Sequence, residues 1–158
     1  MRVTDMARDR RRLTTGIKRS LRDLSNQIAL LNHQVSMRVA LKDVDLDCLD
    51  LISQHGPLTP STIARRAGLH PATMTGILDR LESNGWIIRE RDAGDRRAVL
   101  IRALPDRTNE IFSLYAGMDG SLDDICTGYD DSQLGLIADF LDRVTIAGHR
   151  ATAELAGE

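Results

Sequence analysis

The sequence predicts a mainly α-helical fold with one small β-hairpin. Aromatic residues make up only 3% of the 158 residues, so the core has to be built from Leu, Ile, Val, Ala and Met, which suits packed helices better than a β-sandwich. Apolar residues recur at helical spacing along most of the chain, and the spacing changes to that of strands only after Gly85. The length fits one domain with its own hydrophobic core.

The N-terminal part of the chain predicts a flexible arm followed by a long helix. Residues 1–12 are polar and rich in arginine, and we expect a basic, flexible arm there. From Ile17 to Val35 apolar residues alternate at spacings of four and three, which predicts a helix to about Ala40. This helix is longer than one small domain needs to cover. Residues 13–42 are therefore expected to serve both the core and the contact with a second chain.

Three shorter helices are predicted next. Residues 43–54 fit an amphipathic helix that Gly56-Pro57 ends. Residues 60–67 fit a short helix with Thr59 as its N-cap and a proline at its first position. After a three-residue gap, residues 71–84 fit another helix with apolar positions at i, i+3, i+4 and i+7. Two short helices joined by a tight, glycine-containing turn are typical of a helix-turn-helix.

A β-hairpin follows this helix pair directly. Residues 86–91 are rich in strand-forming side chains, residues 92–95 are typical of a turn, and residues 98–102 predict the return strand. A hairpin in this place is a wing. Residues 43–104 are therefore predicted to form a winged helix-turn-helix lobe.

Two further helices are predicted after the hairpin. An amphipathic pattern starts after Pro105 and continues to Ile125. A last helix follows Asp130, whose spacing to Gln133 is that of a capping box. Residues 105–158 are thus expected to be helical.

Charge is distributed unevenly along the chain, whose net charge is −2. Residues 1–22 carry +6 and residues 61–102 carry +3, whereas residues 23–60 carry −3 and residues 103–158 carry −8. A basic face on an acidic body is typical of a nucleic-acid-binding protein, and the acidic body keeps the rest of the molecule away from phosphates. On charge alone, an ordinary solvated surface fits equally well.

The face of the helix over residues 71–84 that is opposite its apolar side fits the major groove of DNA. Its N-terminal half is small and polar and has no acidic residue before Asp79. Gly76 costs about 1 kcal/mol relative to alanine in a helix, which close approach of a DNA backbone would explain. Arginines at a hairpin tip fit the minor groove, and Asp95 is placed to orient one of them. The predicted contacts are Pro71, Ala72, Thr73, Thr75, Gly76 and Arg80 in the helix, Arg91, Asp95, Arg96 and Arg97 in the wing, and Thr59 and Ser61 on the DNA backbone.

These segments resemble the MarR family of bacterial regulators. The Asp95-Arg96-Arg97 sequence of the wing is the most specific part of the resemblance, which covers residues 56–102 by motif and nearly the whole chain by helix order. The matching segments are Gly56–Thr59, Ile63–Leu69, Pro71–Thr75, Leu78–Glu82, Gly85–Ile87 and Arg91–Arg97.

The resemblance implies a homodimer that binds a palindromic operator in double-stranded DNA. In such proteins the first helix and the last two helices form the dimer interface, which for this chain means residues 13–42 and 105–158. Many members are repressors that are released by a small apolar or phenolic anionic ligand bound between the dimerisation helices and the DNA-binding lobe. This sequence departs from the family at His70, where a serine is common, and at Gly76, where a larger polar residue is common.

Candidate ligand-binding residues are the polar side chains that interrupt apolar helix faces. Asn32, His33 and Ser36 in the first helix, and His55 at the end of the second, are predicted to line such a cleft. The histidines fit equally well as structural residues. Neither cysteine, Cys48 or Cys126, has metal-ligand spacing to the other or to a histidine, so no metal or cofactor is predicted. Both cysteines fit buried apolar positions, and redox sensing is the alternative.

Other classes of protein fit the sequence less well. A phosphate-binding loop, a nucleophile elbow and a metal-binding dyad are all absent from the sequence, so we do not expect an enzyme. A winged-helix module for protein–protein interaction is the alternative, but protein interfaces deplete charge at their centre and the predicted wing is charged. No run of about 18 apolar residues and no secretory signal is present, so a cytoplasmic protein without membrane association is expected.

Overall fold

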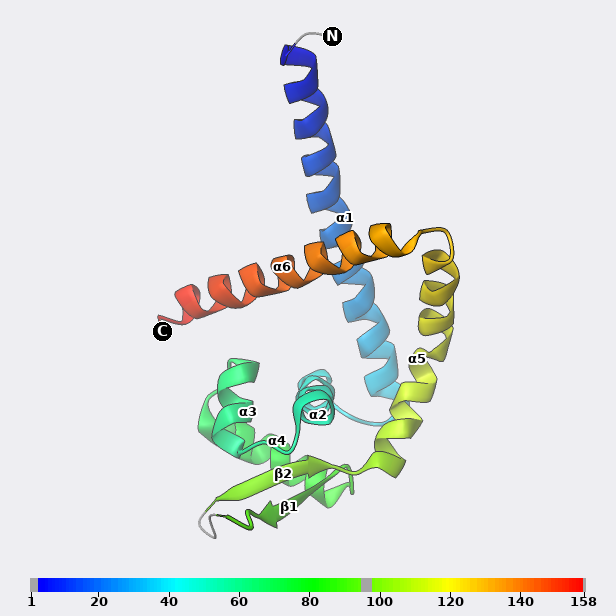
Figure 1. The fold of residues 1–158 in the computed structure, drawn as a ribbon. Coiled ribbons are helices and arrows are strands. Elements are labelled where there is room, and N and C mark those ends of the chain that lie inside the picture. The colour runs from blue at the N-terminus through cyan, green and yellow to red at the C-terminus, as the bar shows by residue number, and fades with distance from the viewer. Residues whose placement is uncertain (1–2, 95–97, 158) are drawn as a thin grey trace.

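The structure, a computed structural model, describes residues 3–94 and 98–157 (Figure 1). This part of the chain contains six helices and two strands. In chain order they are α1 (Val3–Arg38), α2 (Asp43–His55), α3 (Pro60–Ala67), α4 (Pro71–Ser83), β1 (Ile87–Arg91), β2 (Val99–Ala103), α5 (Pro105–Cys126) and α6 (Asp131–Ala156). The predicted fold class, mainly helical with one β-hairpin wing after a helix-turn-helix, is confirmed.

The helices α2, α3 and α4 pack with the hairpin around one core at one end of the molecule (Figure 1). Each element contributes at least one fully buried side chain: Leu49 from α2, Ile63 from α3, Leu81 from α4, and Ile87 and Ile101 from the two strands. Burying an aliphatic side chain of this size contributes about 1.5–3 kcal/mol. This shared core fixes α4 relative to the hairpin.

The hairpin is antiparallel and is fastened to the helices at its base. Ile87 pairs with Ala103 and Arg91 pairs with Val99. The backbone of Leu58, just before α3, forms two hydrogen bonds with the backbone of Ile101, with N···O distances of 2.7 and 3.1 Å. The wing therefore extends from the lobe on a base that both the helix pair and the core hold in place.

Local capping signals determine where several of the helices begin and end. The Thr59 side chain accepts a hydrogen bond from the backbone N–H of Thr62, as expected for an N-cap. Gly68 adopts a left-handed conformation (φ 64°), which satisfies the last carbonyls of α3. At the start of α6, Asp130 and Gln133 form both hydrogen bonds of the predicted capping box.

The first helix is longer at its N-terminus than the sequence indicated. Residues 3–12, predicted as a flexible arm, are the first turns of α1. The segment holds no glycine or proline before Gly16, and arginine, alanine and methionine are good helix formers, so nothing local interrupts the helix. At the other end α1 stops at Arg38, because Ala40 adopts a left-handed conformation (φ 55°) that closes the turn.

The three long helices, α1, α5 and α6, project away from the lobe and leave apolar side chains exposed. The N-terminal half of α1 extends to the end of the molecule opposite the hairpin (Figure 1). No residue of α6 is buried, although this helix carries a regular apolar face. The Arg107 guanidinium lies 4.2 Å from the centre of the Trp86 ring, which fixes the start of α5 on the lobe. Within the described residues, no helix combines the length and the apolar character that crossing a membrane requires.

Candidate nucleic-acid interface

Helix α4 buries one face and presents the other to solvent. Met74, Ile77, Leu78 and Leu81 are buried in the core of the lobe. Pro71, Ala72, Thr73 and Thr75 are exposed, and Gly76 is half-buried. The sequence-predicted reading residues at the start of α4 therefore lie together on one accessible surface, which we call the α4 face.

The first turn of α4 is stabilised by its own side chains. The Nδ1 atom of His70 accepts a hydrogen bond from the Ala72 backbone N–H at 3.2 Å, so this histidine serves as the N-cap in place of the more common serine. The Thr75 hydroxyl donates to the Pro71 carbonyl at 3.1 Å. Its oxygen remains available as an acceptor, and its methyl group adds apolar surface to the α4 face.

Arg80 lies in a different environment from the one that the sequence indicated. Its guanidinium donates two hydrogen bonds to the Asp45 carboxylate, Nε to Oδ2 at 2.9 Å and Nη2 to Oδ1 at 2.6 Å. Asp45 belongs to α2 and is only 2% exposed. The ion pair with Asp45 raises the pKa of the Arg80 guanidinium, chiefly through the hydrogen bonds. In this structure Arg80 holds α4 against α2.

A second ion-pair group ties the hairpin to the same helix. Arg89 of β1 donates to the Asp79 carboxylate at 2.6 Å and to Glu82, both on α4. Arg102 pairs with Glu90 across the hairpin at 3.1 Å. The two ion pairs of Arg89 orient the wing on α4, whereas the pair of Arg102 and Glu90 lies within the hairpin.

Arg91 at the end of β1 is exposed, and among the described residues no ion pair holds it. It is thus the described wing arginine that is best placed to meet a ligand. The predicted wing contacts Asp95, Arg96 and Arg97 lie outside the residues that the structure describes.

The two predicted contacts at the start of α3 lie next to each other. Ser61 is exposed and Thr59 is half-buried, and their hydroxyl oxygens are 3.1 Å apart. Because Thr59 caps α3, its hydroxyl is occupied by the helix. Ser61 is the more accessible of the two.

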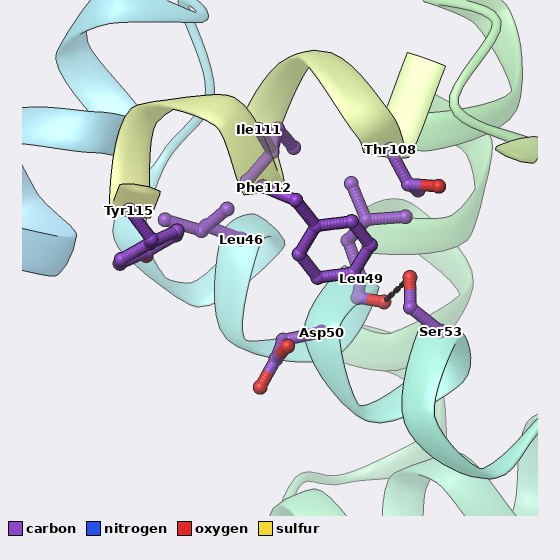
Figure 2. Close-up of a pocket in the computed structure, with 8 residues that line it drawn as sticks. All are labelled: Leu46, Leu49, Asp50, Ser53, Thr108, Ile111, Phe112 and Tyr115. Carbon is purple, nitrogen blue, oxygen red and sulfur yellow. Dashed lines mark hydrogen bonds between the residues drawn. The ribbon is translucent and has the colours of Figure 1, made fainter. Parts of the chain in front are cut away.

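Of the predicted ligand-binding residues, Asn32 lies in a cleft between the long helices and the lobe. This α2–α5 cleft has a volume of about 400 Å³ and is lined by Asn32, Asp47, Asp50, Phe112, Tyr115 and Asp119, among others. Asn32 accepts a hydrogen bond from the Tyr115 hydroxyl at 2.9 Å. Figure 2 shows the adjoining part of the cleft, where the Phe112 ring projects from α5 toward Leu49 on α2.

The charges in the α2–α5 cleft oppose an anionic ligand. Three carboxylates, those of Asp47, Asp50 and Asp119, line it, and none of its described lining residues is basic. Desolvation and the neighbouring carboxylates of Asp43 and Asp50 raise the pKa of Asp47. An anion about 5 Å from one carboxylate is repelled by roughly 1–3 kcal/mol, so aromatic walls and acidic groups together favour a positively charged group.

His33 and Ser36 connect the first two helices through Asp43. The Asp43 carboxylate accepts a hydrogen bond from the Ser36 hydroxyl and contacts the His33 Nδ1 atom at 2.9 Å. The Ser36 bond and, second, the His33 bond lower the pKa of Asp43. These three side chains join the end of α1 to the start of α2, and the described lining of the α2–α5 cleft includes neither His33 nor Ser36. His55 lies elsewhere, in a separate cavity that also involves α3 and α6.

The environment of Cys48 argues against redox sensing by this residue. Its side chain is buried in the core of the lobe. Burial, followed by the charges of Asp47 and Asp45, raises the pKa of the Cys48 thiol to about 11, so the reactive thiolate is scarce at neutral pH. The structure thus supports the prediction of a buried apolar position for Cys48, whereas Cys126 is half-buried.

Sequence reasoning missed two residues that organise these sites. Asp45 was not among the predicted site residues, yet it is the buried partner of Arg80. Tyr115 was not among them either, yet its hydroxyl donates a hydrogen bond to Asn32. The sequence does contain a signal for the role of Asp45. It lies on the otherwise apolar, inward-facing side of its helix, where burying a carboxylate without a partner is unfavourable in free energy, so a partner is expected.

Comparison with known proteins agrees with this geometry. The sequence model of the MarR family matches residues 41–99, from just before α2 to the start of β2. YcgE of Bacillus subtilis (strain 168), described as an uncharacterized HTH-type transcriptional regulator, is 30% identical over 122 residues, which cover 77% of this chain and 79% of YcgE.

Solved structures share the fold over most of the chain. A mutant of MepR from a multidrug resistant S. aureus clinical isolate superposes with a TM-score of 0.71 at 16% identity, covering 83% of this chain and 96% of MepR. Streptococcus pneumoniae FabT in complex with DNA superposes with a TM-score of 0.66 at 18% identity, covering 87% of this chain and 99% of FabT. This chain belongs to the MarR family and is a DNA-binding transcriptional regulator.

Proposed function

We propose that the chain acts as a homodimer on a palindromic operator in double-stranded DNA. The observation that carries the proposal is α6, a helix of 26 residues without a single buried side chain. Ile137, Leu141 and Val144 follow one another at spacings of four and three and are 37–44% exposed. An amphipathic helix gains most of its stability from burying its apolar face, so a second copy of the chain is the natural cover for this one.

The distribution of charge supports an interface between the long helices of two copies. Residues 1–22, which include the first turns of α1, carry +6, and residues 103–158, which include α5 and α6, carry −8. In a two-fold dimer the same patches occur on both copies, so a basic helix of one protomer can face an acidic helix of its partner. Opposite charges would then add to the burial of Leu13, Ile17 and Leu24, which are exposed in the single chain.

In the proposed complex each α4 face enters a major groove and each wing reaches the flanking minor groove. Thr73 and Thr75 supply methyl and hydroxyl groups for base edges, and the hydroxyl of Ser61 contacts the DNA backbone. Two-fold symmetry places the half-sites about one helical turn apart. FabT, which shares the fold, was solved in complex with DNA.

We further propose that the protein acts as a repressor and that a small molecule releases it from DNA. The α2–α5 cleft lies between the lobe and the long helices, where a ligand can prefer one spacing of the two lobes over another. Only such a difference in affinity can shift the DNA-binding equilibrium.

Selection of bound sequences from random duplex DNA, repeated over a range of salt concentrations, tests the DNA-binding proposal. We expect enrichment of a palindrome with half-sites about ten base pairs apart and a steep loss of affinity with salt. Transcription from a promoter that carries the selected site then reports the sign of regulation. Selection without any enriched sequence would indicate a protein-interaction module instead.

Arg91→Ala is expected to weaken operator binding about equally across sequences. The exposed guanidinium lies at the wing, and loss of one phosphate contact should reduce the slope of log affinity against log salt by about 1. Arg102→Ala is the matched control, since its guanidinium is paired with Glu90 on the same hairpin. Equal effects of the two substitutions would contradict a specific role for Arg91.

Gly76→Ala is expected to stabilise the protein and yet weaken operator binding. A Cβ atom at Gly76 would meet only the Arg80 Nη1 atom, at 3.6 Å, which is an ordinary contact. The protomer therefore has room for it, and alanine should raise the free energy of unfolding by about 1 kcal/mol. If the DNA backbone approaches Gly76 closely, operator affinity should fall about tenfold. Gly117→Ala in α5, where a Cβ atom also has space, should leave affinity unchanged.

A further inference from the structure

The N-terminal half of α1 gathers positive charge, as does the cavity near His55, which Arg65 and Arg66 of α3 also line. Residues 6–20 of α1 are all exposed. Five exposed arginines in this half follow one another at helical spacing, so they share one side of the helix. We call this set the α1 stripe; its members are Arg8, Arg11, Arg12, Arg19 and Arg22.

The α1 stripe points away from the apolar side of the same helix. Ile17 follows Arg8 by nine residues, which is about two and a half turns of helix and therefore the opposite side. The apolar side continues through Leu24 to Val35, which is buried in the core of the lobe. A partner chain that covers this side, as proposed above, would meet Arg10, which lies seven residues before Ile17, and would leave the α1 stripe exposed.

Little of the charge in the α1 stripe is neutralised within the described residues. The ion pair found there joins Arg12 to Asp9 at 3.9 Å, and the two side chains are 82% and 74% exposed, so it contributes little to stability. The arginines border an open groove of about 420 Å³ whose described lining includes Thr15 and Gly16 and no carboxylate. Like charges three or four residues apart destabilise a helix slightly, so helix formation does not explain the stripe.

We propose that the α1 stripe binds the phosphate backbone of a second DNA duplex, so that the protein bridges two segments of DNA. Guanidiniums pair with phosphate oxygens through two parallel hydrogen bonds, and every member of the stripe is an arginine. From Arg8 to Arg22 the stripe extends about 21 Å, which is long enough to contact several phosphates of one strand. Duplex DNA is the polyanion that a DNA-binding regulator already holds, so other DNA segments are close by.

The position of the α1 stripe separates it from the DNA that the lobe reads. The N-terminal half of α1 extends to the end of the molecule opposite the hairpin (Figure 1). About 24 Å of helix lies between Arg22 and the end of α1 at Arg38. A straight duplex in contact with the α4 face and the wing therefore does not reach the stripe, and a second duplex can bind at the same time.

A lipid surface fits the α1 stripe less well than DNA does. An amphipathic helix on a membrane buries its apolar side among the lipids and keeps its basic residues at the headgroups. In α1 the apolar side continues into the core of the lobe at Val35, so it is not free along its length to enter a bilayer.

Capture of DNA by protein-coated beads tests the bridge with the full chain. Beads that carry a duplex of mixed sequence are loaded with protein and washed, a short fluorescent duplex is added, and capture is normalised to the protein on the beads. We expect the wild-type protein to capture the second duplex. Arg11→Gln/Arg19→Gln should lower the affinity of capture by about tenfold or more and reduce its salt slope by about 2, because two phosphate contacts are lost.

Two further variants serve as controls. Arg143→Gln/Arg150→Gln removes the same charge from exposed positions of α6 and should leave capture unchanged. Arg11→Lys/Arg19→Lys keeps the charge and should retain most of the capture. Glutamine is a good helix former, so circular dichroism should show an intact helix in the variant that loses capture.

Several results would overturn the proposal. Wild-type beads that capture no second duplex would do so, and so would an equal loss of capture in the α1 and α6 glutamine variants. A shift of Arg11→Gln/Arg19→Gln from dimer to monomer in sedimentation would show that the α1 stripe contacts an acidic helix of the partner chain instead. Binding to phosphatidylserine vesicles without capture of DNA, lost in the same variant, would assign the stripe to a membrane.

Discussion

Ile137→Asp/Leu141→Asp is expected to convert the protein into a folded monomer that has lost operator binding. Both side chains lie on the apolar face of α6 and are 39% and 44% exposed in the single chain. A charge buried without a partner in an interface costs about 3–5 kcal/mol. The dimer dissociation constant should therefore rise by roughly a thousandfold or more, and operator affinity should fall about a hundredfold, because one half-site alone is bound.

Analytical ultracentrifugation and circular dichroism together check this prediction. The fully buried core contains no residue of α6, so its helical signal and cooperative unfolding should persist. Arg143→Asp/Arg150→Asp, which adds acidic groups at exposed positions of the same helix, is the matched control and should remain dimeric. A double variant that is still dimeric at micromolar concentration would show that α6 is not the interface.

Asp45→Asn is expected to lower both the stability of the lobe and its affinity for the operator. The substitution removes the charge from a carboxylate that is 2% exposed and accepts two hydrogen bonds from Arg80. Hydrogen bonds to charged groups contribute about 1.5–3 kcal/mol, so the free energy of unfolding should fall by that amount. Because this pair joins α2 to α4, the α4 face should also become less ordered, and operator affinity should fall about tenfold.

A double-mutant cycle with Arg80→Met separates this positioning role from direct DNA contact. If the pair acts as a unit, the double variant should be little less stable than either single variant. Asp47→Asn is the control, since Asp47 is exposed two residues further along α2 and lines the α2–α5 cleft instead of facing α4. If Arg80→Met alters the preferred base at one operator position while Asp45→Asn does not, then Arg80 reads DNA as the sequence indicated.

Helix ends and the hairpin were predictable because their causes are local. Thr59, Gly68 and the Asp130–Gln133 pair act within one turn of themselves, so a short stretch of sequence contains all the interacting groups. The prediction for the start of α1 was wrong, because a polar, basic segment without a helix breaker is compatible with both an arm and a helix, and the sequence does not show which neighbours stabilise it.

The roles of polar side chains depended on partners that are distant in sequence. His33 and Ser36 were assigned to a pocket, whereas Asp43, ten and seven residues further on, binds both. The charge of the two cavities was likewise not predictable, since each collects residues from three helices.

Neighbouring residues were enough to specify the order of helices and strands, the winged helix-turn-helix and the apolar side of its helices, because caps, turns and periodicity depend on groups that are close along the chain. Only the tertiary structure shows that Arg80 holds α4 in place through Asp45, a partner 35 residues away. The tertiary structure also shows that acidic and basic residues line different cavities. A charged side chain takes its role from the groups within a few ångströms of it, and those groups come together from separate helices only when the chain folds.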